Sequence, residues 1–189
     1  MTENVMHELV QRYYATMRGD EPDPQQVKAI LAFARGLPLV VTSVVQLWVK
    51  YPERFGDLKA ISPEIMPDLV ERLLEGVPQA LIPVLEAAAV VRWFDQPILR
   101  AVMGQADVRD VYNELRRFPF VRTRAEGLAL HDAVREILNE NLRIQDSERY
   151  VELHERAAMY FKTQFSIKKG TQTVVEIIYH QVEVDEDGG

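Results

Sequence analysis

The part of the sequence that most constrains the fold runs from Phe120 to Leu138, FVRTRAEGLALHDAVREIL. Apolar or β-branched residues alternate on both sides of Ala125-Glu126-Gly127, a pattern that is typical of two short strands joined by a turn. Gly127 suits this turn because glycine adopts a positive φ without steric cost. From Asp132 onward apolar residues recur at helical spacing, which indicates one apolar helix face. The stretch therefore predicts a β-hairpin that leads directly into a helix.

Three short helices are predicted before the hairpin. The first covers residues 84–91. The second is capped by Asp95 and closed by Gly104, and the third is capped by Asp107 and runs from Val108 to Arg117. Three helices followed by a two-stranded wing is the order of a winged helix, a variant of the helix-turn-helix.

The N-terminal part of the sequence has helical periodicity. A first helix is predicted over residues 4–17. The stripe expected to be buried consists of Val5, Leu9 and Tyr13, with Met6, Val10 and Met17 beside them. A second helix is predicted from its start signal, with Asp23 as N-cap, Pro24 at the first helical position and Gln26 three residues after the cap.

Gly36, Leu37, Pro38 and Leu39 then separate two helices, because glycine tolerates a left-handed cap and proline needs no amide partner at a helix start. The apolar run 40–48 predicts a third, well-buried helix. The Pro- and Gly-containing segment 51–67 is expected to be a connector between domains. A fourth helix is predicted over residues 68–75.

The C-terminal part is predicted to extend the helical structure. A long amphipathic helix is expected from Asp146 or Ser147 to about Phe161, and Thr173 to Val182 fits either one more helix or a strand. The predicted fold class is mainly α, with one small β-hairpin. Its predicted parts are a helical bundle (1–65), a winged-helix domain (66–145) and a C-terminal helical extension (146–189).

Composition limits the classes of function. The chain has 189 residues, of which 47% are hydrophobic and 27% charged, as in globular domains. A formal net charge of −7 argues against a protein whose whole surface binds nucleic acid. The lack of cysteine excludes disulfides and thiolate chemistry and fits a reducing compartment, so we expect a cytoplasmic protein. No apolar run approaches the roughly 18 residues of a membrane-spanning helix, and no membrane partner is expected.

The common catalytic and phosphate-binding motifs are absent. The sequence has no G-x-x-x-x-G-K-[ST] loop, no G-x-G-x-x-G and no H-E-x-x-H. His7, His131, His154 and His180 lie on separate predicted elements without the spacing of metal ligands. We therefore expect neither a metal site nor catalysis by this chain alone.

Two short motifs resemble a known family. Gly36, Leu37, Pro38 and Leu39 lie between two helices, and Leu130-His131-Asp132 opens a helix at winged-helix distance. This arrangement resembles the GLPL and MHD motifs of the STAND class of signalling NTPases, which includes the NB-ARC proteins. The resemblance covers about Met6 to Phe161, with Leu130 in place of the family's methionine.

The resemblance implies a regulatory function. In the family, the proline at the position of Pro38 packs near the adenine, and the histidine at the position of His131 reaches the β-phosphate of bound ADP. A histidine at a helix start is able to donate to a phosphate. The implied nucleotide-sensing residues are Gly36, Leu37, Pro38, Leu39, His131 and Asp132.

The resemblance also implies partners. Because the P-loop is absent, the chain resembles a fragment that carries no cofactor itself. ATP or ADP with Mg²⁺ is expected on a nucleotide-binding domain N-terminal to it. The C-terminal segment is similar to linker helices that lead into TPR-like repeats. The expected function is to sense the nucleotide state and relay it by domain rearrangement, without catalysis.

Each motif also has a purely structural interpretation. Glycine and proline join two helices for capping reasons alone. A histidine is able to cap a helix, and an aspartate at a helix start favours the positive end of the dipole. The family interpretation therefore depends on both motifs occurring in this order.

Direct DNA binding is the main alternative. Arg109, Arg116 and Arg117 lie on or beside the predicted recognition helix, and Arg122 and Arg124 lie on the wing. Pairing with nearby carboxylates would cancel this charge. With Arg135, the stretch from residue 107 to 135 has six arginines against five acidic residues, a balance of only +1, which is small for a phosphate-binding surface. The acidic residues of this stretch are Asp107, Asp110, Glu114, Glu126 and Asp132.

A third possibility is a protein interaction module. An apolar surface that meets another domain would be exposed in the isolated chain and would favour a homo-oligomer.

Overall fold

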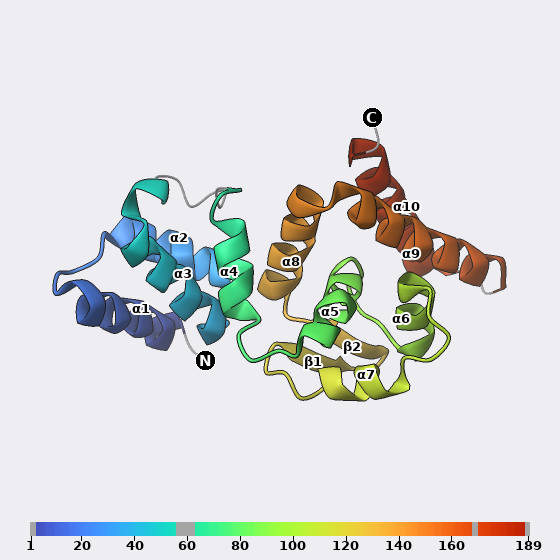
Figure 1. Cartoon of the computed structure of the whole chain (residues 1–189), viewed down its shortest axis with the longest axis horizontal. Coiled ribbons are helices and arrows are strands. Elements are labelled where there is room, and N and C mark those ends of the chain that lie inside the picture. Colours follow the sequence, from blue (N-terminus) through green and yellow to red (C-terminus); the bar gives the residue numbers. More distant parts are fainter. Residues whose placement is uncertain (1–2, 56–62, 168–169, 188–189) are drawn as a thin grey trace. The chain divides into compact units, whose positions relative to one another are not determined.

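The computed structural model describes residues 3–55, 63–167 and 170–187 (Figure 1). The predicted fold class is confirmed, because the described chain is mainly α-helical with one antiparallel β-hairpin. The chain forms two compact units. The first comprises Met1–Gly76 with Asp132–Ile137, and the second comprises Val77–His131 with Leu138–Gly189.

The first unit is a small helical bundle. As predicted, Asp23 caps the second helix: its carboxylate accepts a hydrogen bond from the Gln25 N–H at 2.9 Å. The third helix is strongly buried, as its apolar sequence indicated. The helices of this unit are α1 (Glu3–Arg18), α2 (Pro24–Ala34), α3 (Pro38–Lys50) and α4 (Met66–Leu73), with a 3₁₀ turn at Pro52–Arg54.

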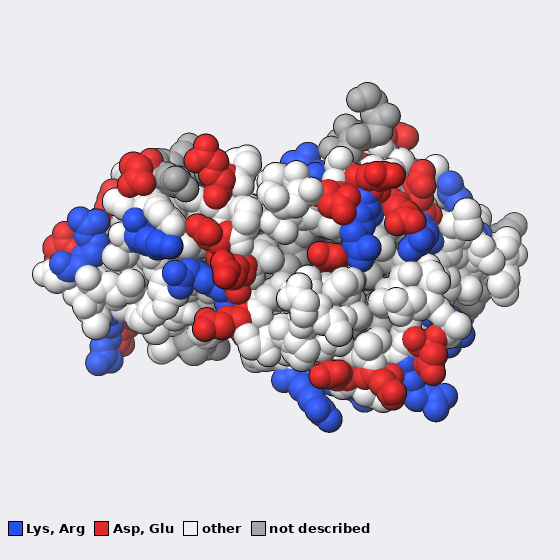
Figure 2. All heavy atoms as spheres, viewed as in Figure 1, with Lys and Arg blue, Asp and Glu red and all other residues white. Residues whose placement is uncertain are grey.

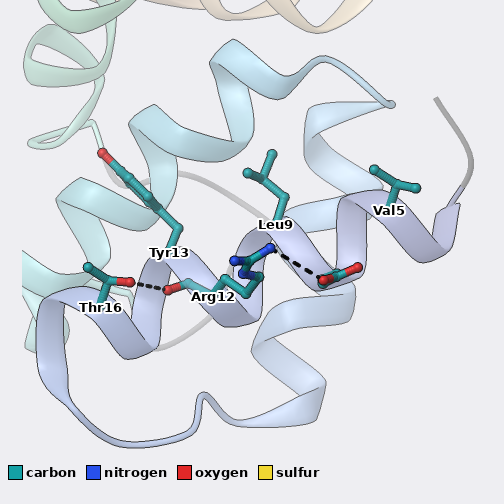
Figure 3. A pocket seen from close by; sticks show the side chains of 6 residues that line it. Val5, Leu9, Arg12, Tyr13 and Thr16 are labelled. Atoms are coloured by element: carbon teal, nitrogen blue, oxygen red, sulfur yellow. Dashed lines mark hydrogen bonds and ion pairs between the residues drawn. The ribbon is translucent and has the colours of Figure 1, made fainter.

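The buried face of α1 differs from the prediction. Met6, Val10 and Tyr14 form its inner face, and the Tyr14 ring packs on Trp48 with ring centroids 4.3 Å apart. Met6 and Val10 were part of the predicted stripe, so the prediction is confirmed for them, and it was wrong for Val5 and Met17, which are 46% and 43% exposed. Val5, Leu9 and Tyr13 line a shallow hollow of about 330 Å³ (Figure 3), and the Tyr13 hydroxyl accepts a hydrogen bond from Nε2 of Gln46 on α3. α1 has apolar residues on two neighbouring faces, and periodicity does not show which of them is buried more deeply.

The connector ends earlier than expected. Gly56 and Ser62, which the prediction placed in it, lie outside the described residues. Helix α4 begins at Met66, so Pro67 lies in its first turn. Leu69 and Leu73 of α4 are buried, and α4 belongs to the same compact unit as α3. The two units therefore divide after Gly76, whereas the sequence placed a domain boundary at residue 65.

The second unit contains the hairpin and the C-terminal helices. The carboxylate of Asp95 accepts the Ile98 N–H at 2.8 Å, and Gly104 closes the same helix in the left-handed conformation, as predicted. The elements are a 3₁₀ turn at Gln79–Leu81, α5 (Ile82–Ala89), α6 (Gln96–Met103), α7 (Arg109–Leu115), β1 (Val121–Arg124), β2 (Gly127–Leu130), α8 (Asp132–Gln145), α9 (Ser147–Ile167) and α10 (Thr171–Asp187). The first six residues of α8 are grouped with the first unit.

The hairpin has a third backbone partner. In the β1–β2 register, Val121 pairs with Leu130 and Arg124 with Gly127. On the other side of β2, Phe94 forms a bridge with Leu128, with N–H to carbonyl distances of 2.7 and 2.8 Å. Phe94 lies between α5 and α6, so the order is helix, bridge residue, helix, helix, hairpin. This is the order of elements that a winged helix has.

The C-terminal segment resolves the choice between helix and strand. Thr173 to Val182 lies within α10, which packs against α9. Helix α9 continues to Ile167, beyond the predicted end near Phe161. The sequence VVEIIY has strand propensity, but Glu176 and His180 are buried and lie four positions apart, as on one face of a helix.

Candidate functional site

The Gly36 turn is built by two consecutive left-handed residues. Arg35 has φ 48° and ψ 35°, and Gly36 has φ 81°. The Arg35 N–H donates to the Leu31 carbonyl at 3.2 Å, and the Leu37 N–H donates to the Ala34 carbonyl at 2.9 Å. Leu37, Pro38 and Leu39 are all partly buried. A left-handed conformation is uncommon for arginine, and such positions occur at functional sites as well as in helix caps.

A hollow of about 700 Å³ lies beside this turn. It combines apolar walls with three basic side chains, His7, Lys28 and Arg35, and its lining contains no acidic residue. Lys28 lies on α2, and Arg35 is the left-handed residue that follows the end of this helix. Met6, Pro24, Leu31, Ala32 and Gly36 complete the lining. Such a lining suits a ligand or a partner surface with both an apolar and an anionic part.

Arg35 has an ion-pair partner within the first unit. Its Nη1 lies 2.8 Å from Oε1 of Glu136, in the part of α8 that belongs to this unit. The two side chains are 47% and 44% exposed, so water screens the pair and its contribution to stability is small. An anion in the hollow would compete with Glu136 for the guanidinium of Arg35.

His131 and Asp132 lie where the chain passes from one unit to the other. His131 is the last residue of the second unit's first segment, and Asp132 begins the segment that belongs to the first unit. The His131 side chain is only 2% exposed, and its backbone N–H donates to the Phe120 carbonyl at 2.7 Å. Asp132 is exposed in the first turn of α8. A ligand therefore reaches the His131 imidazole only if the residues around it move.

The arginines of the DNA-binding alternative are exposed. Arg109, Arg116 and Arg117 lie on α7 or just after it, and Arg122 and Arg124 lie on β1. In the part of the chain that the structure describes, none of the five forms an ion pair within 4.0 Å. The expected pairing with neighbouring carboxylates is therefore not observed.

Sequence reasoning did not find two groups of residues. The first is His7, Lys28 and Arg35, which meet only once α1 and α2 pack together. The second is a buried pair, His154 and His180, whose Nδ1 atoms lie 3.0 Å apart across α9 and α10. These histidines were expected to lie apart, and their separation of 26 positions gave no signal of the contact. The described residues contain no cluster of three or more metal-ligating side chains.

Comparison with protein-family models, with curated proteins and with solved structures found no match to this chain. Within the described ranges, no helix combines the length and the apolar character needed to cross a bilayer.

Proposed function

We propose that this chain is a non-catalytic regulatory module of a nucleotide-dependent switch, which senses the ATP or ADP state and relays it by domain rearrangement. The observation that carries the proposal is the position of His131 and Asp132, at the point where the chain passes between two compact units. A conformational change at this point affects both units, because the backbone of one continues directly into the other. The resemblance of the two motifs to the STAND class supports the same function.

The hollow at Gly36 is the proposed place of contact. Its apolar walls, such as Met6 and Leu31, suit a base or an apolar side chain, and Lys28 and Arg35 suit a phosphate. In this proposal the nucleotide, with its Mg²⁺, is held by a separate nucleotide-binding domain. A phosphate that binds Arg35 releases Glu136, and α8 then loses one of its contacts within the first unit. Binding is thereby coupled to the helix that follows His131.

His131 has a later role in this proposal. Its ring is buried, so it supports the junction of β2 and α8 in this structure. Contact between the imidazole and a phosphate requires that the start of α8 moves first. The absence of cysteine fits action in a reducing compartment such as the cytoplasm.

Titration with fluorescent ADP and ATP, each with Mg²⁺, tests the hollow. We expect weak, saturable binding that the double variant Lys28→Ala/Arg35→Ala reduces about tenfold, because two charge-assisted contacts are removed. The matched control is Arg12→Ala/Arg18→Ala, which changes the net charge equally on α1, outside the hollow's lining. No saturation up to about 1 mM nucleotide, or equal losses in both variants, would contradict the assignment of the hollow.

Fluorescence energy transfer between the units tests the rearrangement. The chain has no cysteine, so Gln11→Cys and Met159→Cys introduce one exposed labelling site in each unit. We expect the transfer efficiency to change on saturation with nucleotide and to change less in the Lys28→Ala/Arg35→Ala background. An efficiency that stays constant while nucleotide binds would remove the relay from the proposal.

A further inference from the structure

The surface of α7 divides into a buried side and two exposed faces. The buried side consists of Val108, Tyr112 and Leu115. Arg109, Asn113 and Arg116 are exposed. Each directly follows one of the buried residues, so these three also share one side of the helix. Arg116 still has helical backbone angles, φ −61° and ψ −17°. These three side chains therefore form one continuous face of α7, with two guanidinium groups and one amide.

The acidic residues of α7 lie on the next face around the helix. Asp110 and Glu114 are four positions apart on α7, and Arg117 follows the helix in a turn. In the view of Figure 2, acidic and basic side chains occur side by side over α7 and the hairpin. The net charge of this region is close to zero, but its basic and acidic side chains lie on different faces of α7. A count of charges along the sequence does not show this separation.

The wing adds two arginines. Arg122 and Arg124 are exposed on β1, and they point to the same side of the strand because they are two positions apart, at about 6.6 Å. β2 lies between β1 and Phe94, so β1 is an edge strand in the described sheet. From residue 116 to residue 124 the sequence has four arginines and no acidic residue. This segment is the most basic part of the second unit.

Phe94 connects α7 to the wing. Its backbone bridges Leu128 of β2, and its ring meets the ring of Tyr112 edge to face, with centroids 6.0 Å apart. Figure 1 shows α7 beside the hairpin, in agreement with these contacts. Helix α7 and the wing are thus linked through Phe94.

We propose that the Arg109–Asn113–Arg116 face of α7, together with Arg122 and Arg124, binds duplex DNA. The major groove of B-form DNA admits an α-helix, whereas the deep, narrow major groove of A-form RNA does not. The arginines contact phosphates, and Asn113 has the donor and acceptor that an adenine edge requires. This function goes beyond the nucleotide switch and does not depend on it.

Arginines at these positions have two other possible roles. Charged side chains on an edge strand prevent edge-to-edge aggregation, and a cation near a helix C-terminus complements the helix dipole. Both roles explain single residues, such as Arg124 or Arg116. They do not explain why residues 116–124 contain four arginines and no acidic residue.

Fluorescence anisotropy with a short labelled DNA duplex of mixed sequence tests the proposal on the full chain. We expect affinity that falls steeply between about 50 and 200 mM salt, with a logarithmic slope of about −3 to −4 for four phosphate contacts. The double variant Arg122→Ala/Arg124→Ala should lower the affinity about tenfold and reduce the slope by about 2. The variant Asn113→Ala should leave the slope unchanged and weaken only the discrimination between duplexes.

Matched controls separate the proposed surface from general charge effects. Arg12→Ala/Arg100→Ala removes the same charge from exposed positions on α1 and α6 and should have little effect. Asp110→Asn/Glu114→Gln removes acidic charge beside the proposed face and should tighten binding. The proposal is overturned by an absence of binding at low salt, by equal losses in the wing and control variants, or by equally tight binding of polyglutamate, a polyanion without phosphates or bases. A preference for duplex RNA over duplex DNA would also overturn it.

Discussion

The first helix of the helical unit and the winged-helix part of the second unit differ in how their sequences specify a buried face. α1 has apolar residues on two neighbouring faces, and only packing against α3 selects the one with Met6 and Val10. In the winged-helix part, alternation marks Leu128 and Leu130, and both are buried, although Ala129 between them is buried as well. Periodicity thus identifies an element, but packing decides whether the marked residues are the ones that are buried.

The winged-helix part also contains a steric constraint that fixes its register. Gly127 has φ 148°, and a Cβ atom at this position would lie 2.4 Å from the Phe94 carbonyl oxygen. That oxygen accepts the Leu128 N–H of the bridge. Gly76, by contrast, has φ 80°, and a Cβ atom there would meet nothing within 4 Å beyond its chain neighbours. Gly127 is required both by its close contact with Phe94 and by its positive φ, whereas Gly76 is required by its positive φ only.

The substitution Gly127→Ala should have the largest effect. We expect a loss of about 3 kcal/mol in the free energy of unfolding of the second unit, from overpacking against Phe94 and from backbone strain. Gly76→Ala should cost about 1 kcal/mol, because only the strain applies. Urea unfolding followed by tryptophan fluorescence measures both.

The two tryptophans make this measurement specific to each unit. Trp48 lies in the first unit and Trp93 in the second, so Trp48→Phe and Trp93→Phe backgrounds each leave one reporter. In the Gly127→Ala variant, the unfolding transition reported by Trp93 should shift to lower urea concentration, and the transition reported by Trp48 should shift less. Similar costs for the two glycine substitutions would mean that the Phe94 contact does not fix the wing.

A matched pair of valines on α1 tests the choice of its buried face. Val10 is fully buried, whereas Val5 is 46% exposed. Val10→Ala should cost about 2 kcal/mol, from two lost methyl groups and the space they leave, and Val5→Ala at most about 0.5 kcal/mol. Urea unfolding followed at Trp48 measures the difference. Equal costs would show that Val5 is covered in solution, as the sequence predicted.

Much of the fold follows from local signals. The caps at Asp23 and Asp95, the turn at Gly127 and the apolar face of α8 were readable because each depends on residues close in sequence. The candidate site was only partly readable. Gly36 and Pro38 mark the turn, but the hollow beside it needs His7 from another helix.

Residues that meet only through tertiary packing gave no signal. The contact between His154 and His180 depends on the packing of α9 against α10. The burial of His131 depends on how the strand–helix junction is covered, and its sequence position indicated only a helix start. The separation of basic and acidic faces on α7 was in principle readable from helical spacing, once the helix itself was assigned.

The smallest expected effect concerns the stability of the second unit at alkaline pH, in which the second unit should also differ from the first unit. Burial, and then the hydrogen bond from its hydroxyl to the Glu183 carboxylate, raises the pKa of Tyr150, and burial also raises the pKa of Tyr112 and Tyr160. All three lie in the second unit. The folded unit therefore keeps these protons above pH 10.0, the ordinary tyrosine pKa, at which the unfolded chain has lost half of them.

Because the folded state then binds more protons than the unfolded state, stability is constant below this pH and falls as the pH rises above it. Tyr150→Phe should make this fall smaller by just under about 1 kcal/mol between pH 8 and 10.5, as one tyrosine no longer contributes. Urea unfolding followed at Trp93 in the Trp48→Phe background measures the slope. Glu183→Gln, which keeps an acceptor but removes the charge, should give an intermediate slope. A slope unchanged by Tyr150→Phe would show that the buried hydroxyl does not hold its proton in the folded unit.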